Sequence, residues 1–161
     1  GGFDEEFADS IAARVIYPDE THACAFTDRG ISFFSSRNQA AVELTSQAEP
    51  EESIQTVFYS DEYAGFIVRT SGGENPYRME LYRINGDPVF TAEFNFQYKH
   101  ADISGDMVIL YNEEACQIYS TSGTLKYSGG LGMEIQQIRQ GRSGSSVIVT
   151  GPQVMKEIRL Q

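Results

Sequence analysis

The sequence predicts an all-β chain of antiparallel, four-stranded, blade-like sheets, the architecture of a β-propeller or partial propeller. Three observations support this: an internal repeat, short runs of apolar residues separated by turn residues, and a composition with nine Tyr, ten Phe and no Trp. Aromatic residues favour strands because their rings pack on a pleated, half-buried surface. The repeat favours a propeller arrangement over a β-sandwich.

The internal repeat relates two segments, 80–90 and 117–127, at an offset of 37 residues. Each copy has an aromatic residue, a turn Gly four positions later, and a second aromatic residue four positions after that. The corresponding pairs are Tyr82 and Tyr119, Gly86 and Gly123, and Phe90 and Tyr127. A period of this size, filled with short strands, is typical of stacked four-stranded sheets.

The first unit covers about residues 13–45 and follows a segment with a different pattern. Phe3, Phe7 and Ile11 have helical spacing with acidic residues between them, so we expect a short N-terminal helix there. Asn38 stands where the repeat has its turn Gly, and Asn readily replaces Gly at positive φ. Four apolar runs are interpreted as strands, at residues 14–17, 22–27, 31–35 and 40–44.

The second unit, residues 53–96, follows a polar, acidic connection at 46–53. Asn85 and Gly86 lie between its last two apolar runs. Asn-Gly in such a place indicates a β-hairpin, because both residues tolerate the positive φ of primed turns. Its strands are expected at residues 54–60, 63–70, 77–84 and 88–95.

The third and fourth units cover residues 97–129 and 133–161 and repeat the plan. We expect the four units to form a single β-repeat domain that is a fragment of a larger protein. The fourth unit has one strand fewer than the others, so one sheet edge is left open. We expect residues 1–17, a second copy of the chain, or a segment outside these residues to cover that edge. The expected strands are 98–103, 107–111, 115–120 and 124–128, then 134–139, 145–150 and 154–160.

The 161 residues carry a formal net charge of −11, distributed unevenly. Residues 1–62 hold 13 acidic and 3 basic residues, whereas residues 63–161 hold 10 and 9. Such a chain repels phosphate backbones, so no nucleic-acid partner is expected. The longest apolar runs are far shorter than the ~20 residues of a membrane helix, so this segment is not expected to insert into a membrane.

The two cysteines and two histidines show no metal-binding spacing. Cys24 and Cys116 lie within apolar strand patterns, which favours two buried thiols over a disulfide. His22 and His100 are interpreted as ordinary strand or loop residues. No catalytic residue, metal site or cofactor is predicted.

Carboxylates at the turns are the candidate site residues. The loops between first and second strands contain Asp19, Glu20, Asp61, Glu62 and Asp106, with Arg142 in the fourth unit. If these loops gather on one propeller face, the carboxylates could bind a cation, with Ca²⁺ the preferred ion, or the hydroxyls of a glycan. The more ordinary interpretation is turn chemistry, because Asp hydrogen-bonds the local backbone.

The C-terminal half resembles a known family in three segments: Ile-Ser-Gly-Asp-Met-Val-Ile-Leu-Tyr at 103–111, Cys-Gln-Ile-Tyr-Ser-Thr-Ser-Gly at 116–123, and Glu-Ile-Arg-Leu at 157–160. In these segments it is similar to uncharacterised clostridial proteins that look like membrane-anchored β-propellers. The resemblance covers residues 20–161. It implies an upstream transmembrane helix, further blades and an extracytoplasmic location, and it brings no catalytic residues.

The function favoured by the sequence is a non-catalytic binding or scaffolding module of an extracytoplasmic cell-envelope protein. Its partner would be a protein or a glycan, and open blade edges could also allow self-association. The alternative is a glycan-active or metal-assisted enzyme with a carboxylate site on one propeller face, formed for example by Asp61 and Asp106.

Overall fold

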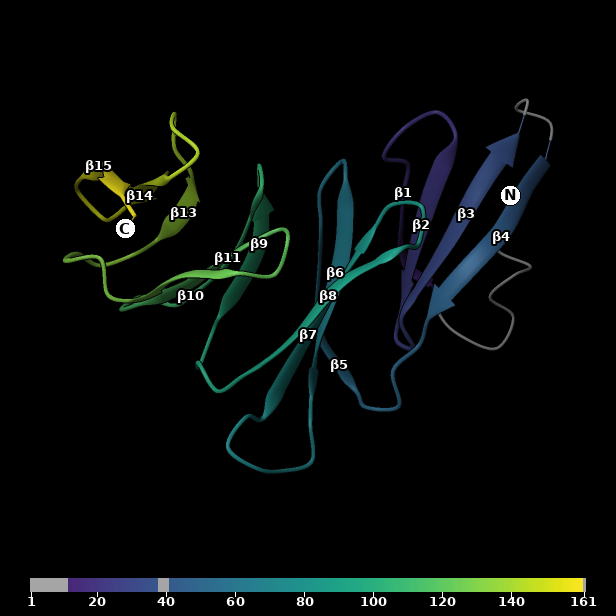
Figure 1. Cartoon of the computed structure of the whole chain (residues 1–161), viewed down its shortest axis with the longest axis horizontal. Coiled ribbons are helices and arrows are strands. Elements are labelled where there is room, and N and C mark those ends of the chain that lie inside the picture. The colour runs from purple at the N-terminus through teal and green to yellow at the C-terminus, as the bar shows by residue number, and fades with distance from the viewer. Residues whose placement is uncertain (1–11, 38–40, 161) are drawn as a thin grey trace. The chain divides into compact units, whose positions relative to one another are not determined.

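A computed structural model describes residues 12–37 and 41–160, in which every regular element is a β-strand. The strands form antiparallel sheets in which chain order is also spatial order (Figure 1). The predicted fold class, an all-β chain of blade-like sheets as in a β-propeller or partial propeller, is confirmed. The N-terminal helix predicted around Phe3 and the turn role predicted for Asn38 fall outside the described residues. No helix in the described parts of the chain has the length and hydropathy needed to cross a membrane.

The chain divides into two compact units, Gly1–Phe94 (unit 1) and Asn95–Gln161 (unit 2). Unit 1 contains two four-stranded sheets. Sheet A consists of β1 (Ala12–Ile16), β2 (His22–Thr27), β3 (Ile31–Arg37) and β4 (Ala41–Ala48). Sheet B consists of β5 (Ile54–Tyr59), β6 (Tyr63–Arg69), β7 (Tyr77–Arg83) and β8 (Pro88–Phe94).

Sheets A and B share an apolar core. Because side chains alternate between the faces of a strand, Cys24 and Phe26 of β2 point to one face, and Ala64 and Phe66 of β6 join them in one buried cluster. Tyr82 of β7 packs against this cluster, with its ring centroid 5.7 Å from that of Phe33 in β3. Tyr82 therefore packs between the two sheets.

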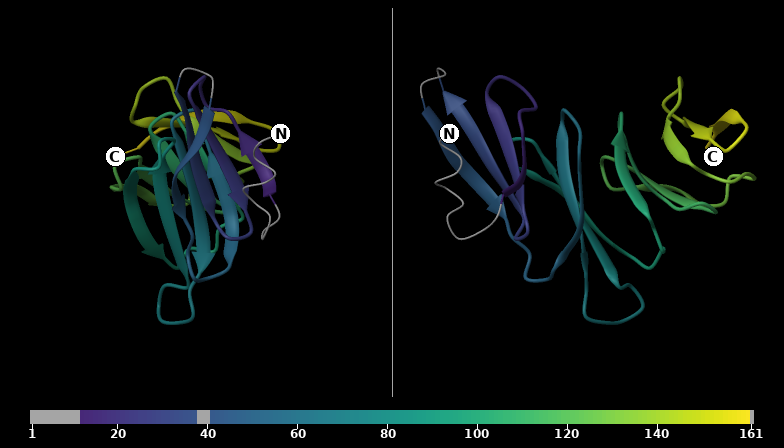
Figure 2. Two further views of the ribbon diagram at one scale, coloured as in Figure 1. Left: turned by 90° about the vertical axis from the view of Figure 1, so that its right-hand side faces the viewer. Right: turned by 180° about the vertical axis from the view of Figure 1, so that it is seen from behind.

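Unit 2 contains sheets C and D, seen from two further directions in Figure 2. Sheet C consists of β9 (His100–Ser104), β10 (Met107–Tyr111), β11 (Cys116–Ser120) and β12 (Leu125–Gly129). Sheet D has three strands, β13 (Gln137–Gln140), β14 (Ser146–Thr150) and β15 (Met155–Arg159). Their shared core is mainly aliphatic and includes Ile109, Ile118, Ile138, Val147 and Val149.

The sequence repeat corresponds to a repeated backbone feature. Gly86 and Gly123 have φ values of 95° and 100°, in the region that favours Gly. Just before each turn, the strand pairing shifts register at Tyr82 and at Tyr119. The two hairpins therefore share their turn geometry and a β-bulge, which explains why the sequence pattern recurs.

Two sequence-based expectations need correction. The strand predicted to end at residue 44 runs to Ala48, because the chain passes through a bulge after Leu44 and Gln47 then pairs with Ser32. The acidic connection therefore begins only after Ala48. Part of the segment expected to cover the open edge of the fourth unit, residues 12–16, instead forms β1 and pairs with β2.

Candidate functional site

The predicted acidic residues all lie in loops between the first and second strands of their sheets. Asp19 and Glu20 follow β1, Asp61 and Glu62 follow β5, and Asp106 follows β9. In unit 1 the two loops lie at the same end of their sheets (Figure 1). Within residues 12–37 and 41–160, no three His, Cys, Asp or Glu side chains come close enough to hold a metal ion. The proposed Ca²⁺ binding stays a prediction.

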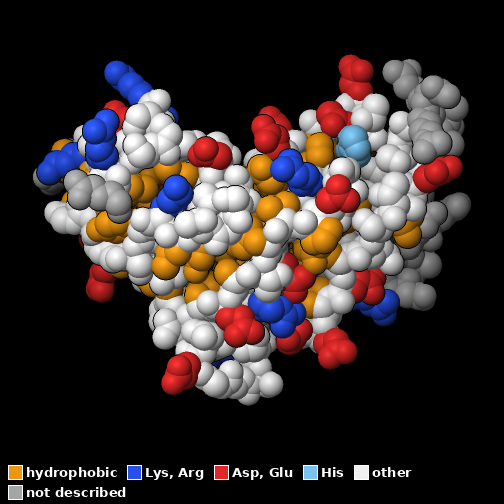
Figure 3. All heavy atoms as spheres, in the orientation of Figure 1, with side chains coloured by type: hydrophobic (Ala, Val, Ile, Leu, Met, Phe, Trp, Pro, Cys, Tyr) orange, Lys and Arg blue, Asp and Glu red, His pale blue; other side chains and the backbone are white. Residues whose placement is uncertain are grey.

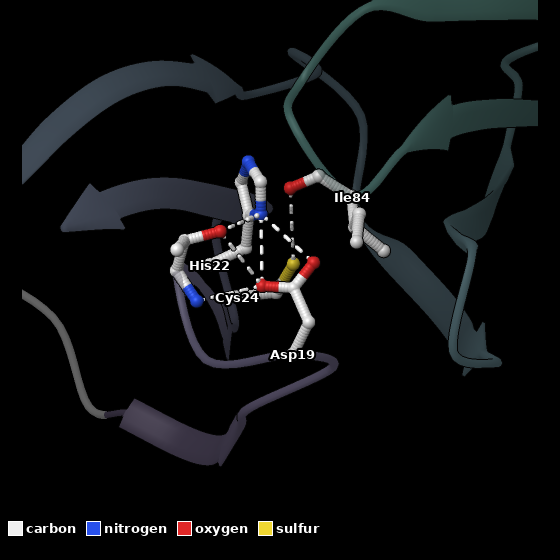
Figure 4. Close-up of polar contacts among 5 residues, drawn as sticks. Asp19, His22, Cys24 and Ile84 are labelled. Atoms are coloured by element: carbon white, nitrogen blue, oxygen red, sulfur yellow. Dashed lines mark hydrogen bonds and ion pairs between the residues drawn. The ribbon is translucent and has the colours of Figure 1, made fainter. Parts of the chain in front are cut away.

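Asp19 organises the β1–β2 loop through four hydrogen bonds (Figure 4). Its Oδ1 accepts from the Thr21 amide at 2.8 Å and from the Thr21 hydroxyl at 3.1 Å. The Nδ1 atom of His22 lies 2.9 Å from Oδ1 and 3.0 Å from Oδ2 of the same carboxylate. The carboxylate thus closes the loop and fixes the His22 ring, with Nε2 on the side away from Asp19.

The hydrogen bonds favour the charged form of the Asp19 carboxylate. Burial alone would raise its pKa, but the bonds from the Thr21 amide, His22 and the Thr21 hydroxyl lower the pKa below its ordinary value. The pKa of Cys24, two residues after His22, is shifted upwards. Burial of the thiol, together with the negative charge of Asp19, raises this pKa to about 12. Its thiol lies 3.8 Å from the Ile84 carbonyl oxygen. Asp19, His22 and Cys24 therefore lie close together without an activated nucleophile, because the thiol remains protonated at neutral pH.

Asp106 joins two sheets of unit 2. Its amide donates to Oε1 of Gln140 at 3.2 Å, and its Oδ1 accepts from Nε2 of Gln140 at 2.5 Å. The backbone N–H of Gln140 in turn donates to the Ser104 hydroxyl at 2.8 Å. This arrangement, which we name the Gln140 clasp, commits the Asp106 carboxylate to a contact between β13 and the β9–β10 loop.

The other predicted site residues make fewer contacts. Asp61 and Glu62 are exposed, and the Ser60 hydroxyl accepts from the Glu62 amide at 3.3 Å. Asp61 lies in unit 1 and Asp106 in unit 2. Arg142 lies in the β13–β14 loop, where its amide donates to Oε2 of Glu157 at 2.9 Å.

A hollow of about 410 Å³ lies at the β1–β2 end of sheet A, on the face opposite the shared core. Phe34 pairs with Ala23 and with Leu44, so these three side chains share that face. Tyr17, Val42 and Leu44 are 67%, 55% and 43% exposed there. The described lining residues are Tyr17, Glu20, Thr21, His22, Ala23, Phe34, Ser35, Ser36 and Val42.

Reasoning from the sequence missed this hollow and the contact between Asp19 and His22. The contact had a local signal, because an Asp two residues before Thr21 can form an Asx turn that brings His22 within reach. The hollow had none, since its lining comes from three strands and a loop. The chemistry offered here is apolar contact area bordered by hydroxyl groups and one carboxylate, Glu20.

The cysteines behave as the sequence predicted. Cys24 and Cys116 are both buried and free, so the preference for thiols over a disulfide is confirmed. Burial raises the pKa of Cys116 to about 12 as well. Neither thiol can serve as a nucleophile or as a readily deprotonated metal ligand at neutral pH.

Comparison with solved structures shows similarity in fold. A functionally unknown protein from Desulfotomaculum acetoxidans DSM 771 matches with a TM-score of 0.54 and 12% identity, over 94% of this chain and 56% of that one. Hsv2 from Kluyveromyces lactis matches with a TM-score of 0.50 and 8% identity, over 95% and 47%. BamB from Moraxella catarrhalis matches with a TM-score of 0.48 and 15% identity, over 93% and 49%. The chain thus spans about half the length of these structures.

Sequence comparison assigns the chain to a family without assigning it an activity. No curated protein matches it. The model of a family of unknown function, DUF5711, matches residues 1–160, which is nearly the whole chain. This chain therefore belongs to the DUF5711 family.

Proposed function

We propose that the chain is a non-catalytic binding module of an extracytoplasmic cell-envelope protein and that it uses the open face of sheet A to hold a protein partner. The observation that carries the proposal is the hollow lined by exposed Tyr17 and Val42, on a face of sheet A that also carries exposed Leu44. Apolar side chains grouped around a concave surface with a polar rim are typical of binding sites. Val42 and Leu44 are aliphatic, which suits a protein better than a glycan, whose rings stack on aromatic side chains.

The state of the reactive groups supports a role in binding. Both thiols are held protonated by burial, and the carboxylates of Asp19 and Asp106 are engaged in local hydrogen bonds. These groups stabilise loops and sheets. No observation on the described residues favours the glycan-active alternative.

A photo-crosslinking experiment in living cells tests the binding surface. A benzoylphenylalanine residue is introduced in place of Leu44 in the full-length protein. The matched control is Leu125, which is 49% exposed and occupies the corresponding position before the bulge in sheet C, opposite Tyr119 as Leu44 is opposite Phe34. We expect a protease-sensitive crosslinked product at position 44 that is lost when Val42→Ser is added. Equal crosslinking at both positions, or only at position 125, would overturn the proposal.

The proposed location has a separate test. The resemblance to membrane-anchored clostridial proteins supports an extracytoplasmic module. Because Cys24 and Cys116 are buried with a pKa of about 12, they should not react with a membrane-impermeant maleimide. Ser71→Cys, in the exposed β6–β7 loop, should then be labelled in intact cells without permeabilisation. Labelling that requires permeabilisation would place the module in the cytoplasm.

A further inference from the structure

The outer edge of β15 differs from the corresponding position in the other three sheets. In sheets A, B and C a fourth strand pairs antiparallel with the third. In the described part of the chain, β15 pairs only with β14. A strand edge leaves backbone N–H and C=O groups without β-sheet partners, so it can accept another strand.

The repeat shows which residue of β15 faces the absent strand. The turn before the third strand has the same length in sheets A, C and D, which makes Ile31, Cys116 and Met155 equivalent. The bulge shared by β7 and β11 adds Met79 to this set. Ile31, Met79 and Cys116 are completely buried, whereas Met155 is 62% exposed. Because Met155 is equivalent to these three residues, the next residue, Lys156, is equivalent to the residue that follows each of them, namely Ser32, Glu80 and Gln117.

That following residue forms a polar cross-strand pair in every four-stranded sheet. The three pairs are Ser32 with Gln47, Glu80 with Thr91, and Gln117 with Ser128. Two of them are hydrogen-bonded, at 3.2 Å from Gln47 to Ser32 and at 3.3 Å from Gln117 to Ser128. Lys156 occupies this position, and none of the described strands pairs with its outer side.

The charges along β15 indicate the chemistry of the missing partner. Glu157 is already engaged, since its Oε2 accepts from the Ser146 hydroxyl at 2.7 Å and from the Arg142 amide at 2.9 Å. Lys156 and Arg159 form no ion pair with a described residue. The edge thus presents two uncompensated cations, beside exposed Met155 and Val154.

We propose that the outer edge of β15 binds an extended strand of another polypeptide segment, antiparallel to β15 and with an acidic side chain opposite Lys156. Backbone hydrogen bonds supply most of the attraction, and the cross-strand ion pair sets the register. This edge belongs to unit 2 and the proposed protein-binding face to unit 1, so the two proposals can fail independently.

Synthetic peptides test this proposal with the folded chain. The probe is a fluorescently labelled peptide of residues 87–95, which contains β8, in a T91E and a T91K version. Thr91 is the residue opposite Glu80 in sheet B. We expect the T91E peptide to bind about fivefold more tightly than the T91K peptide, measured by fluorescence anisotropy.

Charge reversal on the protein provides the decisive comparison. The Lys156→Glu variant should bind the T91K peptide more tightly than the T91E peptide. The control variant Lys126→Glu, changed at an exposed residue of β12 in sheet C, should still bind the T91E peptide more tightly. Circular dichroism verifies that both variants fold. Absence of binding at millimolar peptide, or the same peptide preference in Lys156→Glu, would overturn the proposal. Concentration-dependent self-association that Lys156→Glu abolishes would also overturn it, because a second copy would then supply the strand.

Discussion

Unit 1 and unit 2 are built from the same kind of sheet but join their two sheets differently. Unit 1 uses aromatic residues, with Phe26, Phe33, Phe66 and Tyr82 in or against its core cluster. Unit 2 uses mainly aliphatic residues and adds the polar Gln140 clasp. Antiparallel sheets of the same kind can therefore be joined by different side-chain chemistry, because each pair of sheets needs only complementary buried faces.

The charge distribution separates the units further. Residues 1–94 contain 17 acidic and 6 basic residues, a net charge of −11, and residues 95–161 contain 6 of each. Acidic side chains are the commonest charged groups over the part of the surface in Figure 3 that unit 1 forms. All six basic residues of unit 1 are Arg. Arg14, Arg69 and Arg83 lie over the rings of Tyr59, Tyr77 and Tyr63 at 5.5 to 5.7 Å.

This use of Arg has a physical reason. A planar guanidinium stacks on an aromatic face and binds carboxylates through two parallel hydrogen bonds, which a Lys ammonium cannot do. Arg78 shows the second mode, donating to the two oxygens of Glu52 at 2.5 and 2.9 Å. In an acidic unit rich in Tyr, the few cations thus also become packing elements.

The largest expected effect tests whether the two units are energetically separate. Phe66→Ala empties a fully buried position in unit 1 and should cost about 3–5 kcal/mol, through lost apolar contact and a residual cavity. Ile118→Ala is the corresponding change in unit 2, at about 2–5 kcal/mol. Hydrogen exchange resolved by segment should show lost protection mainly in the mutated unit. A uniform loss over residues 12–160 would mean that the two units unfold together.

The second prediction concerns the repeated turn. A Cβ added at Gly86 would lie 2.1 Å from the Ser46 hydroxyl and 3.3 Å from the Phe33 ring, at a φ of +95°. Gly73 has a φ of +85°, and a Cβ added there would meet no atom within 4 Å. Gly73→Ala therefore measures the cost of the positive φ alone. We expect Gly73→Ala to cost about 1 kcal/mol and Gly86→Ala about 2–3 kcal/mol.

Denaturant midpoints measure both Gly variants. Adding Ser46→Gly to Gly86→Ala should recover part of the difference, because it removes the hydroxyl that the new methyl group meets. Equal costs for the two single variants would show that the contact with sheet A contributes nothing.

The third prediction tests the polar contact that is specific to unit 2. Gln140→Ala removes the bonds to Asp106 and should lower the free energy of unfolding by about 1 kcal/mol. Gln137→Ala, at an exposed position of the same strand, is the control and should change little. Urea titration followed by circular dichroism provides the measurement. A loss as large for Gln137→Ala would assign the effect to strand propensity.

The smallest effect is a dependence on pH. The Arg78 hydrogen bonds lower the pKa of Glu52 from 4.5 to about 2, so its stabilising contribution is present above pH 4.5 and is lost as the pH falls towards 2. In unit 2, bonds from the Ser146 hydroxyl and the Arg142 amide likewise lower the pKa of Glu157. Glu157 is exposed and Glu52 is partly exposed, so solvent screening keeps each effect modest.

Matched Gln variants separate these two carboxylates. Relative to wild type, Glu52→Gln and Glu157→Gln should each be less stable at pH 7. The difference should vanish as the pH falls towards 2 for Glu52→Gln, and it should shrink as the pH falls below 4.5 for Glu157→Gln. Hydrogen exchange at both pH values should place the first change in unit 1 and the second in unit 2. Unchanged stability of Glu52→Gln at pH 7 would contradict a role for the ion pair.

Some elements could be predicted from the sequence and others could not. The Asn85-Gly86 hairpin was predictable because a turn with positive φ strongly favours Asn and Gly at those positions. The length of β4 was not, because Ser46 and Gln47 are polar and remain in the strand only through a bulge and the pairing of Gln47 with Ser32. The turn acids were identified as candidates, yet their bonding partners could not be. Asp106 and Gln140 are 34 residues apart.

By itself the sequence determined the fold class, the strand-and-turn repeat, the three-stranded last unit and the buried thiols. These follow from alternation, turn chemistry and composition, all of which act over a few neighbouring residues. Only the tertiary structure decided which face of sheet A carries the hollow and that Asp106 is engaged by Gln140. Each of these depends on residues distant in sequence, and only the pairing and packing of whole sheets bring them together.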